Sequence, residues 1–104
     1  MDGNNRPWAA DLARCGLDYI EAFTPAPDTD MSITDALSAW PDKVLWINFP
    51  SSVHLASVET IRRTAREIVA AARDTGRVII GITEDMPPDR WQQSLLTISE
   101  AINE

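Results

Sequence analysis

The chain has 104 residues, of which 44% are hydrophobic and 24% charged, and its 9 Lys and Arg against 16 Asp and Glu leave a formal net charge of −7. This composition fits one globular domain, residues 1–104, with a buried core, and argues against a mainly disordered chain and against nucleic-acid binding. Because no apolar run suits a membrane span or a signal peptide, we expect a cytoplasmic protein with no membrane partner.

The first predicted pair of elements is a helix followed by a strand. Over residues 7–15, Trp8, Leu12 and Cys15 recur with helical spacing and form one apolar stripe. Residues 18–24 are rich in aromatic and β-branched side chains and are stopped by Pro25, which is typical of a short strand.

The second pair repeats this order. Ser32 and Asp35 have the spacing of a variant capping box at the start of a short helix that ends at Pro41. Residues 43–49 are almost all apolar, a pattern typical of a strand covered on both faces in a parallel sheet. We therefore expect Trp46 to be packed rather than exposed.

The third unit has the clearest helix, over residues 57–75, and its arginines are interpreted as a solvated face because Arg63 and Glu67 are i,i+4 partners. Residues 77–83 predict a third buried strand. A last helix begins near Pro88, and four apolar residues share one face of it: Trp91, Leu95, Ile98 and Ile102.

The predicted order α-β-α-β-α-β-α indicates an α/β fold of three parallel βα units joined by right-handed crossovers. A parallel sheet of three apolar strands leaves two open edges. We therefore expect self-association to complete the fold, most simply as a two-fold dimer.

Three segments carry a resemblance to a known family: Glu21-Ala22-Phe23-Thr24-Pro25, Leu45-Trp46-Ile47-Asn48-Phe49-Pro50 and Gly81-Ile82-Thr83-Glu84-Asp85-Met86-Pro87. In this order they resemble the last three βα units of the uroporphyrinogen decarboxylase-like superfamily of (β/α)8 barrels. The resemblance covers nearly the whole chain but only the C-terminal part of such a barrel, and it therefore implies a partial TIM-barrel-like arrangement of the three βα units.

The resemblance also shows where this chain departs from the family. The decarboxylases bind a tetrapyrrole at the mouth of the barrel and use a histidine in the last strand's loop, at the position matched here by Ile82. The related zinc methyltransferases use cysteines at positions that match Asp2 and either Ile82 or Thr83. Porphyrinogen decarboxylation by this chain alone and a zinc thiolate site are therefore not expected.

Candidate ligand-binding residues follow from the rule that parallel strands present their functional side chains at their carboxyl ends. They are Glu21, Thr24, Asn48, Ser51, Ser52, His54, Thr83 and Glu84.

Three of these positions have alternative interpretations. Glu21 is expected on the same face as Phe23, either inward and paired or on the surface. His54, the only histidine, is either a general base or a solvent-exposed loop residue. Ser51 and Ser52 either hold an anion with backbone N–H groups or serve as turn and cap residues.

Two functions are consistent with these patterns. The first is a partial (β/α)8-barrel protein related to uroporphyrinogen decarboxylase-like enzymes, whose reaction, if it has one, is that of a lyase and needs a second copy or a missing N-terminal barrel chain. The alternative is a small, non-catalytic, oligomeric α/β module that binds a small molecule or another protein. With one His, one Cys and no convergent carboxylate trio, no metal or cofactor is expected.

Overall fold

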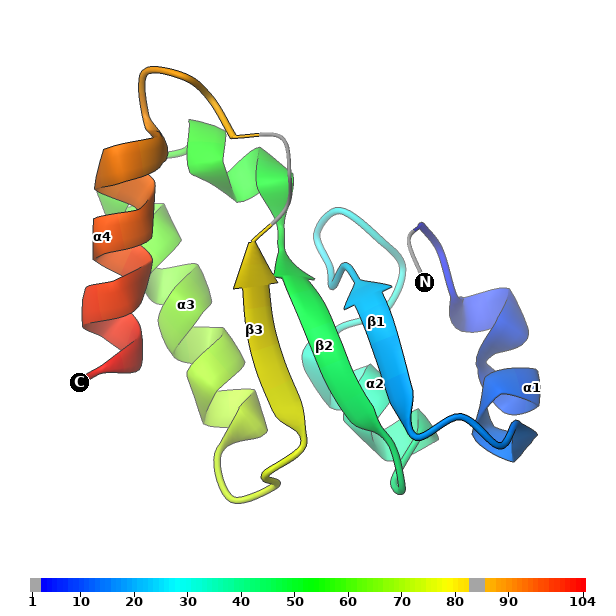
Figure 1. The fold of residues 1–104 in the computed structure, drawn as a ribbon. Coiled ribbons are helices and arrows are strands. Elements are labelled where there is room, and N and C mark those ends of the chain that lie inside the picture. The colour runs from blue at the N-terminus through cyan, green and yellow to red at the C-terminus, as the bar shows by residue number, and fades with distance from the viewer. Residues whose placement is uncertain (1–2, 83–85) are drawn as a thin grey trace.

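A computed structural model describes residues 3–82 and 86–104 of the chain (Figure 1). Its elements are, in order, η1 (Arg6–Trp8), α1 (Ala9–Arg14), β1 (Tyr19–Phe23), α2 (Ile33–Ala39), β2 (Val44–Phe49), η2 (Ser51–Leu55), α3 (Val58–Ala72), β3 (Val78–Ile82) and α4 (Trp91–Ile102). The predicted alternation of helices and strands is confirmed. The two short 3-10 helices, η1 and η2, were not predicted.

The three strands form one parallel sheet in the order β1-β2-β3, so that β2 is central. In the register of the sheet, Val44 lies opposite Tyr19 of β1, and Leu45 lies opposite Val78 of β3. Both the parallel pairing and the central position of the second strand confirm the prediction. Each strand lies beside the strand that precedes it along the chain.

The two faces of this sheet have different surroundings. On one face, alternate side chains are buried among residues of the helices: Ile20, Phe23, Leu45, Ile47 and Phe49 from the strands, and Ala36, Leu37, Trp40, Ile61, Ala65 and Ile68 from α2, α3 and the residue after α2. On the other face, which we call the bare face, Tyr19, Trp46 and Ile79 are 57%, 46% and 42% exposed. In Figure 1 the helices lie behind and beside the sheet, and none of the described helices crosses in front of it. The predictions that the strands are covered on both faces and that Trp46 is packed are therefore wrong, because all the helices pack on one side.

A bulge in β1 places Phe23 on the opposite face from Glu21. Ala22 has a φ of 58°, and the register shifts between Glu21, which pairs with Trp46, and Phe23, which pairs with Ile47. The extra residue turns Phe23 into the core, on the same side as Ile20, although the two are three positions apart. Glu21 points to the other side and is exposed. The prediction that Glu21 shares a face with Phe23 is therefore wrong.

The amino edge of the sheet, from which the strands start, is closed by two cationic side chains. Lys43 is 1% exposed, and its Nζ donates hydrogen bonds to the carbonyl oxygens of Cys15 at 2.9 Å and Leu17 at 2.7 Å. The Arg77 guanidinium donates to the carbonyl of Lys43 and to two carbonyls at the C-terminal end of α2. Charge-assisted bonds of this kind contribute about 1.5–3 kcal/mol each, so this edge is built for stability.

The start of α2 and the exposed face of α3 can be compared with the sequence predictions. The Asp35 N–H donates to the Ser32 hydroxyl at 3.0 Å, and the Ser32 N–H donates to the Asp35 carboxylate at 3.3 Å, which confirms the capping box. In α3, Arg63 Nε and Glu67 Oε1 lie 3.9 Å apart with both side chains exposed, which confirms that i,i+4 pair. The solvated face is confirmed only in part, because Arg62 and Arg66 form ion pairs with Glu100 and Glu104. Among the described residues, no helix combines the length and the apolar character that a membrane crossing requires.

Two predicted apolar stripes are wrong in part. Trp8, in the first, is 59% exposed. In α4, Trp91 is 45% exposed and Ile102 is 40% exposed, and the buried face instead contains Ser94, Thr97, Ile98 and Ala101. The reason is that α4 packs chiefly against α3, at the margin of the sheet, so only a narrow strip with small residues turns inward.

Candidate functional site

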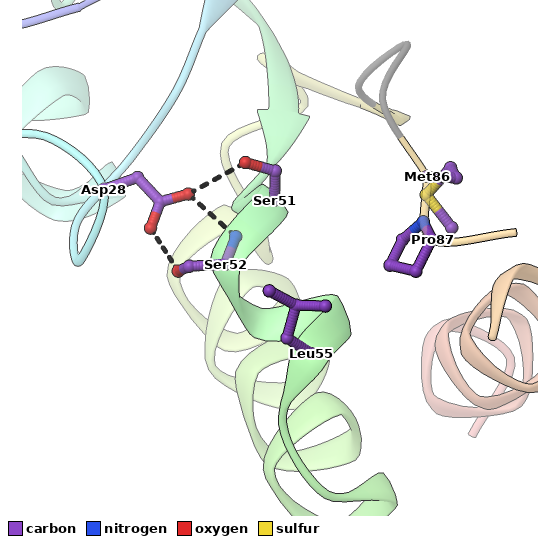
Figure 2. Close-up of a pocket in the computed structure, with 6 residues that line it drawn as sticks. All are labelled: Asp28, Ser51, Ser52, Leu55, Met86 and Pro87. Atoms are coloured by element: carbon purple, nitrogen blue, oxygen red, sulfur yellow. Dashed lines mark hydrogen bonds between the residues drawn. The ribbon is translucent and has the colours of Figure 1, made fainter. Parts of the chain in front are cut away.

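The carboxyl edge of the sheet carries a cavity of about 620 Å³ that is lined by three different connections. Asp28 comes from the connection after β1, Ser51, Ser52 and Leu55 come from η2 after β2, and Met86 and Pro87 come from the connection after β3. Figure 2 shows the Asp28 carboxylate directed at the two serines, with Met86 and Pro87 across the opening. We call this space the carboxyl-edge cavity.

Asp28 is held by the start of η2. Its Oδ2 accepts from the Ser52 N–H at 3.2 Å and from the Ser51 hydroxyl at 3.4 Å, and its Oδ1 accepts from the Ser52 hydroxyl. The anion bound at the start of η2 is thus the carboxylate of Asp28, from the same chain. This arrangement supports the interpretation of Ser51 and Ser52 as turn and cap residues, and it also places both in the cavity.

His54 is fully buried, which contradicts the interpretation of a solvent-exposed loop residue. It lies in η2, its Nδ1 shares a hydrogen bond with the Ser94 hydroxyl of α4, and its ring packs against Phe49 at a centroid distance of 5.2 Å. The reason for the error is that η2 folds back under α4 instead of forming an open loop.

Burial also sets the ionisation of His54. Desolvation lowers the pKa of the imidazole from its ordinary 6.5, and the negative charge of Asp28 opposes this shift in part. Its Nε2 is buried without a hydrogen-bond partner in the described part of the chain. Because His54 and Ser94 are both fully buried, a substrate has no access to the pair in this conformation, and its contacts fit a structural link between η2 and α4.

The other predicted residues within the described ranges are not among those that line the cavity. Glu21 is exposed, and Thr24 and Asn48 are half-buried; Asn48 lies beside Gly81 in the register of the sheet. Thr83 and Glu84 fall outside the described residues. Of the six candidates that lie within the described residues, the structure therefore brings Ser51 and Ser52 to the cavity.

The residue that sequence reasoning missed is Asp28. It follows Pro25 and Pro27 in the connection after the first strand, and the prolines there indicate only that the strand ends. An acidic residue in a connection at the carboxyl edge is itself a signal, because such connections converge on the ligand sites of parallel α/β folds. The same rule that selected Ser51 would also have selected Asp28.

Metal-binding chemistry has no evident place in this part of the molecule. Over residues 3–82 and 86–104, no three His, Cys, Asp or Glu side chains gather in a way that could hold a metal ion. The single cysteine, Cys15, is a free, half-buried thiol near the opposite edge of the sheet, where its carbonyl accepts from Lys43.

The site thus offers a carboxylate, two hydroxyls and an apolar wall at the edge where parallel α/β folds bind their ligands. These groups can orient a small molecule through hydrogen bonds and apolar contact. No protein-family model matches the chain, and no curated protein matches it.

Proposed function

We propose that this chain is a partial (β/α)8-barrel protein related to uroporphyrinogen decarboxylase-like enzymes, and that it binds a small molecule in the cytoplasm once a partner covers its bare face. The observation that carries the proposal is the one-sided packing of helices on a parallel sheet whose strands follow chain order.

The one-sided packing favours a barrel over a doubly wound sheet. Doubly wound folds place helices on both faces of the sheet, whereas a barrel places every helix outside and packs the other face of the strands inside. Successive barrel strands are also neighbours, as β1, β2 and β3 are. In a barrel, Tyr19, Trp46 and Ile79 would belong to the interior layers, which accounts for large apolar side chains on a face that the described helices leave open.

The partner is a second copy of the chain in a two-fold dimer, or a separate chain that supplies the remaining βα units. Parallel sheets occur almost only with both faces covered. In the register of the sheet, Trp46 pairs with Glu21 on one side and with Ile79 on the other. The partner must therefore cover one acidic and two apolar side chains that lie side by side.

The ligand is expected at the carboxyl-edge cavity, where a neutral or mixed-charge polar molecule is preferred over a polycarboxylate because Asp28 is an anion. A lyase reaction of the decarboxylase kind would need groups from the partner, since Ile82 stands where the resemblance places the family's histidine.

A non-catalytic oligomeric module is the second candidate, and the exposed row of Tyr19, Trp46 and Ile79 supports it independently of any chemistry. Nuclear magnetic resonance titration with small metabolites and a porphyrin carboxylate tests whether a ligand binds at the barrel mouth. Shifts at Ser51 and Ser52 favour a barrel-mouth site, whereas shifts confined to Asp42 and Thr75, at the opposite edge, would contradict it.

Light scattering tests the assembly directly. If the partner is a second copy, we expect a mass of at least twice the 11.5 kDa of one chain at micromolar to millimolar concentration. If it is a separate chain, we expect that increase when the separate chain is added. Trp46→Lys should reduce this mass to that of a monomer, because a charge would replace an apolar contact on the bare face.

Trp91→Lys is the matched control, since Trp91 is 45% exposed against 46% for Trp46 but lies on α4. The control should leave the mass unchanged. Dissociation by Trp91→Lys alone would place the interface on α4 and overturn the barrel proposal.

A further inference from the structure

Among the described residues that line the carboxyl-edge cavity, the polar side chains are those of Asp28, Ser51 and Ser52, and they offer a ligand hydrogen-bond acceptors. Ser51 and Ser52 each have one hydroxyl proton, and in both cases it is donated to Asp28, as is the Ser52 N–H. A hydroxyl whose proton is already engaged offers a ligand only lone pairs, and a carboxylate offers about four acceptor sites, of which three are used here. A ligand that binds these groups must therefore supply the donors.

The negative charge of Asp28 also favours a ligand that supplies hydrogen-bond donors. Asp28 is exposed, and it is in no ion pair within residues 3–82 and 86–104. Arg90 enters from the connection before α4, but its guanidinium donates to the carbonyls of Leu55 at 2.9 Å and Ala56 at 2.5 Å. The carboxylate of Asp28 is thus left for a cation from outside the described chain.

The rest of the lining is apolar. Leu55 is 65% exposed, and Met86 and Pro87 face the serines across the opening (Figure 2). A short aliphatic group can rest on this wall while a donor at its end reaches Asp28. A fully hydrated inorganic cation would gain nothing from the wall.

We infer that the carboxyl-edge cavity selects small organic cations, in which an ammonium or guanidinium group is attached to a short aliphatic body. This inference rests on the proposed function, and it replaces an unspecified polar ligand by a charged class. The ammonium donates to the free acceptor position of Asp28 and to the serine oxygens, and the aliphatic body contacts Leu55 and Met86.

The experiment is a nuclear magnetic resonance titration of the full chain with n-butylammonium, n-butanol and butyrate, three probes of similar size that differ in charge. We expect butylammonium to shift the amide signals of Ser51, Ser52 and Leu55 and to bind about fivefold more tightly than butanol, the range of an exposed ion pair. The preference should fall as salt is raised.

Variants test the role of the carboxylate. Asp28→Asn keeps the size of the side chain and removes its charge, and it should abolish the preference for butylammonium over butanol; Asp28→Glu, which retains the charge, should restore part of it. Asp42→Asn removes one negative charge at the amino edge and should leave the preference intact. Amide spectra of each variant show whether η2 remains folded.

The outcomes separate this inference from the proposed function. Equal binding of butanol, or tighter binding of butyrate, at the same residues would overturn the selection of cations and leave the carboxyl-edge site standing. No shift at these residues with any probe would overturn both. Loss of the preference in Asp42→Asn would show that net charge, and not Asp28, attracts the cation.

Discussion

Leu45 and Trp46 are neighbours in the central strand, both are apolar, and they have opposite surroundings. Leu45 is fully buried beneath the helices, whereas Trp46 is 46% exposed on the bare face. Successive side chains of a strand point to opposite faces, so the difference is one of face and not of residue type. The comparison shows that the chain carries apolar side chains for two covered faces but supplies helices for only one.

The two faces are therefore expected to differ in what their residues contribute. Side chains on the covered face hold the single chain together, since their burial occurs when the chain folds. Side chains on the bare face contribute little to the stability of the single chain, because they stay exposed to water until a partner binds.

The largest effect is expected for Leu45→Ala on the covered face. Removing a fully buried leucine side chain should lower the free energy of unfolding by about 3 kcal/mol, because apolar burial is lost and a cavity remains. Urea denaturation at a chain concentration low enough for the monomer to predominate measures it. Trp46→Ala is the comparison, and it should cost less than about 1 kcal/mol under the same conditions; equal losses would show that the bare face also supports the monomer.

Gly81→Ala sharpens the description of the bare face. A Cβ at Gly81 would lie 2.8 Å from the Ile47 carbonyl oxygen and 3.1 Å from Trp46 Nε1, so the indole lies close against this glycine. We expect a loss of about 1–3 kcal/mol in the free energy of unfolding. Gly16→Ala is the control, since a Cβ there meets nothing within 4 Å and should change stability by less than about 0.5 kcal/mol. A stable Gly81→Ala variant would mean that β2 and β3 can move apart at Ile47 enough to admit the Cβ.

The smallest effect is a dependence on pH that originates at His54, beside the carboxyl end of the covered face. Because burial lowers the pKa of His54 in the folded chain, the unfolded chain binds the proton first as the pH falls below about 6.5. Stability from the neutral imidazole is therefore fully present above pH 6.5 and is lost as the pH falls through the folded pKa.

Chemical denaturation between pH 8 and pH 5.5 measures this dependence. His54→Gln should show a shallower decline than the natural chain, even though its stability at pH 8 is itself lower. Contributions from carboxyls with a lowered pKa, such as Asp35 and Glu104, occur in both proteins and cancel in the difference. Parallel curves for the two proteins would contradict the assignment of the decline to His54.

Local patterns were sufficient where the physical cause is itself local. The spacing of Ser32 and Asp35 predicts a helix start because both partners of the capping box lie within one turn. The apolar residues at helical spacing in α3 predict its buried stripe, of which Ile61, Ala65 and Ile68 are indeed buried. The position of each strand follows in the same way from short apolar runs that end at proline or at a polar connection.

The candidate site was only partly predictable, since its members come from connections that are distant in the chain. The bond between Asp28 and Ser52 joins residues 24 positions apart, and the bond between His54 and Ser94 joins residues 40 positions apart. Neither pair has a spacing that a sequence pattern can indicate. The bulge at Ala22, which turns Phe23 into the core and so separates it from Glu21, likewise depends on pairing with β2.

The sequence by itself therefore determined the order of the elements, the parallel α/β class and the edge of the sheet where polar side chains gather, because each follows from side-chain periodicity and strand direction. Only the tertiary structure decided which face of the sheet the helices cover, which way Glu21 points and that His54 is buried. These three features depend on how separate elements pack. An apolar run such as Val44–Phe49 has the same sequence pattern whether one face of the strand is covered or both.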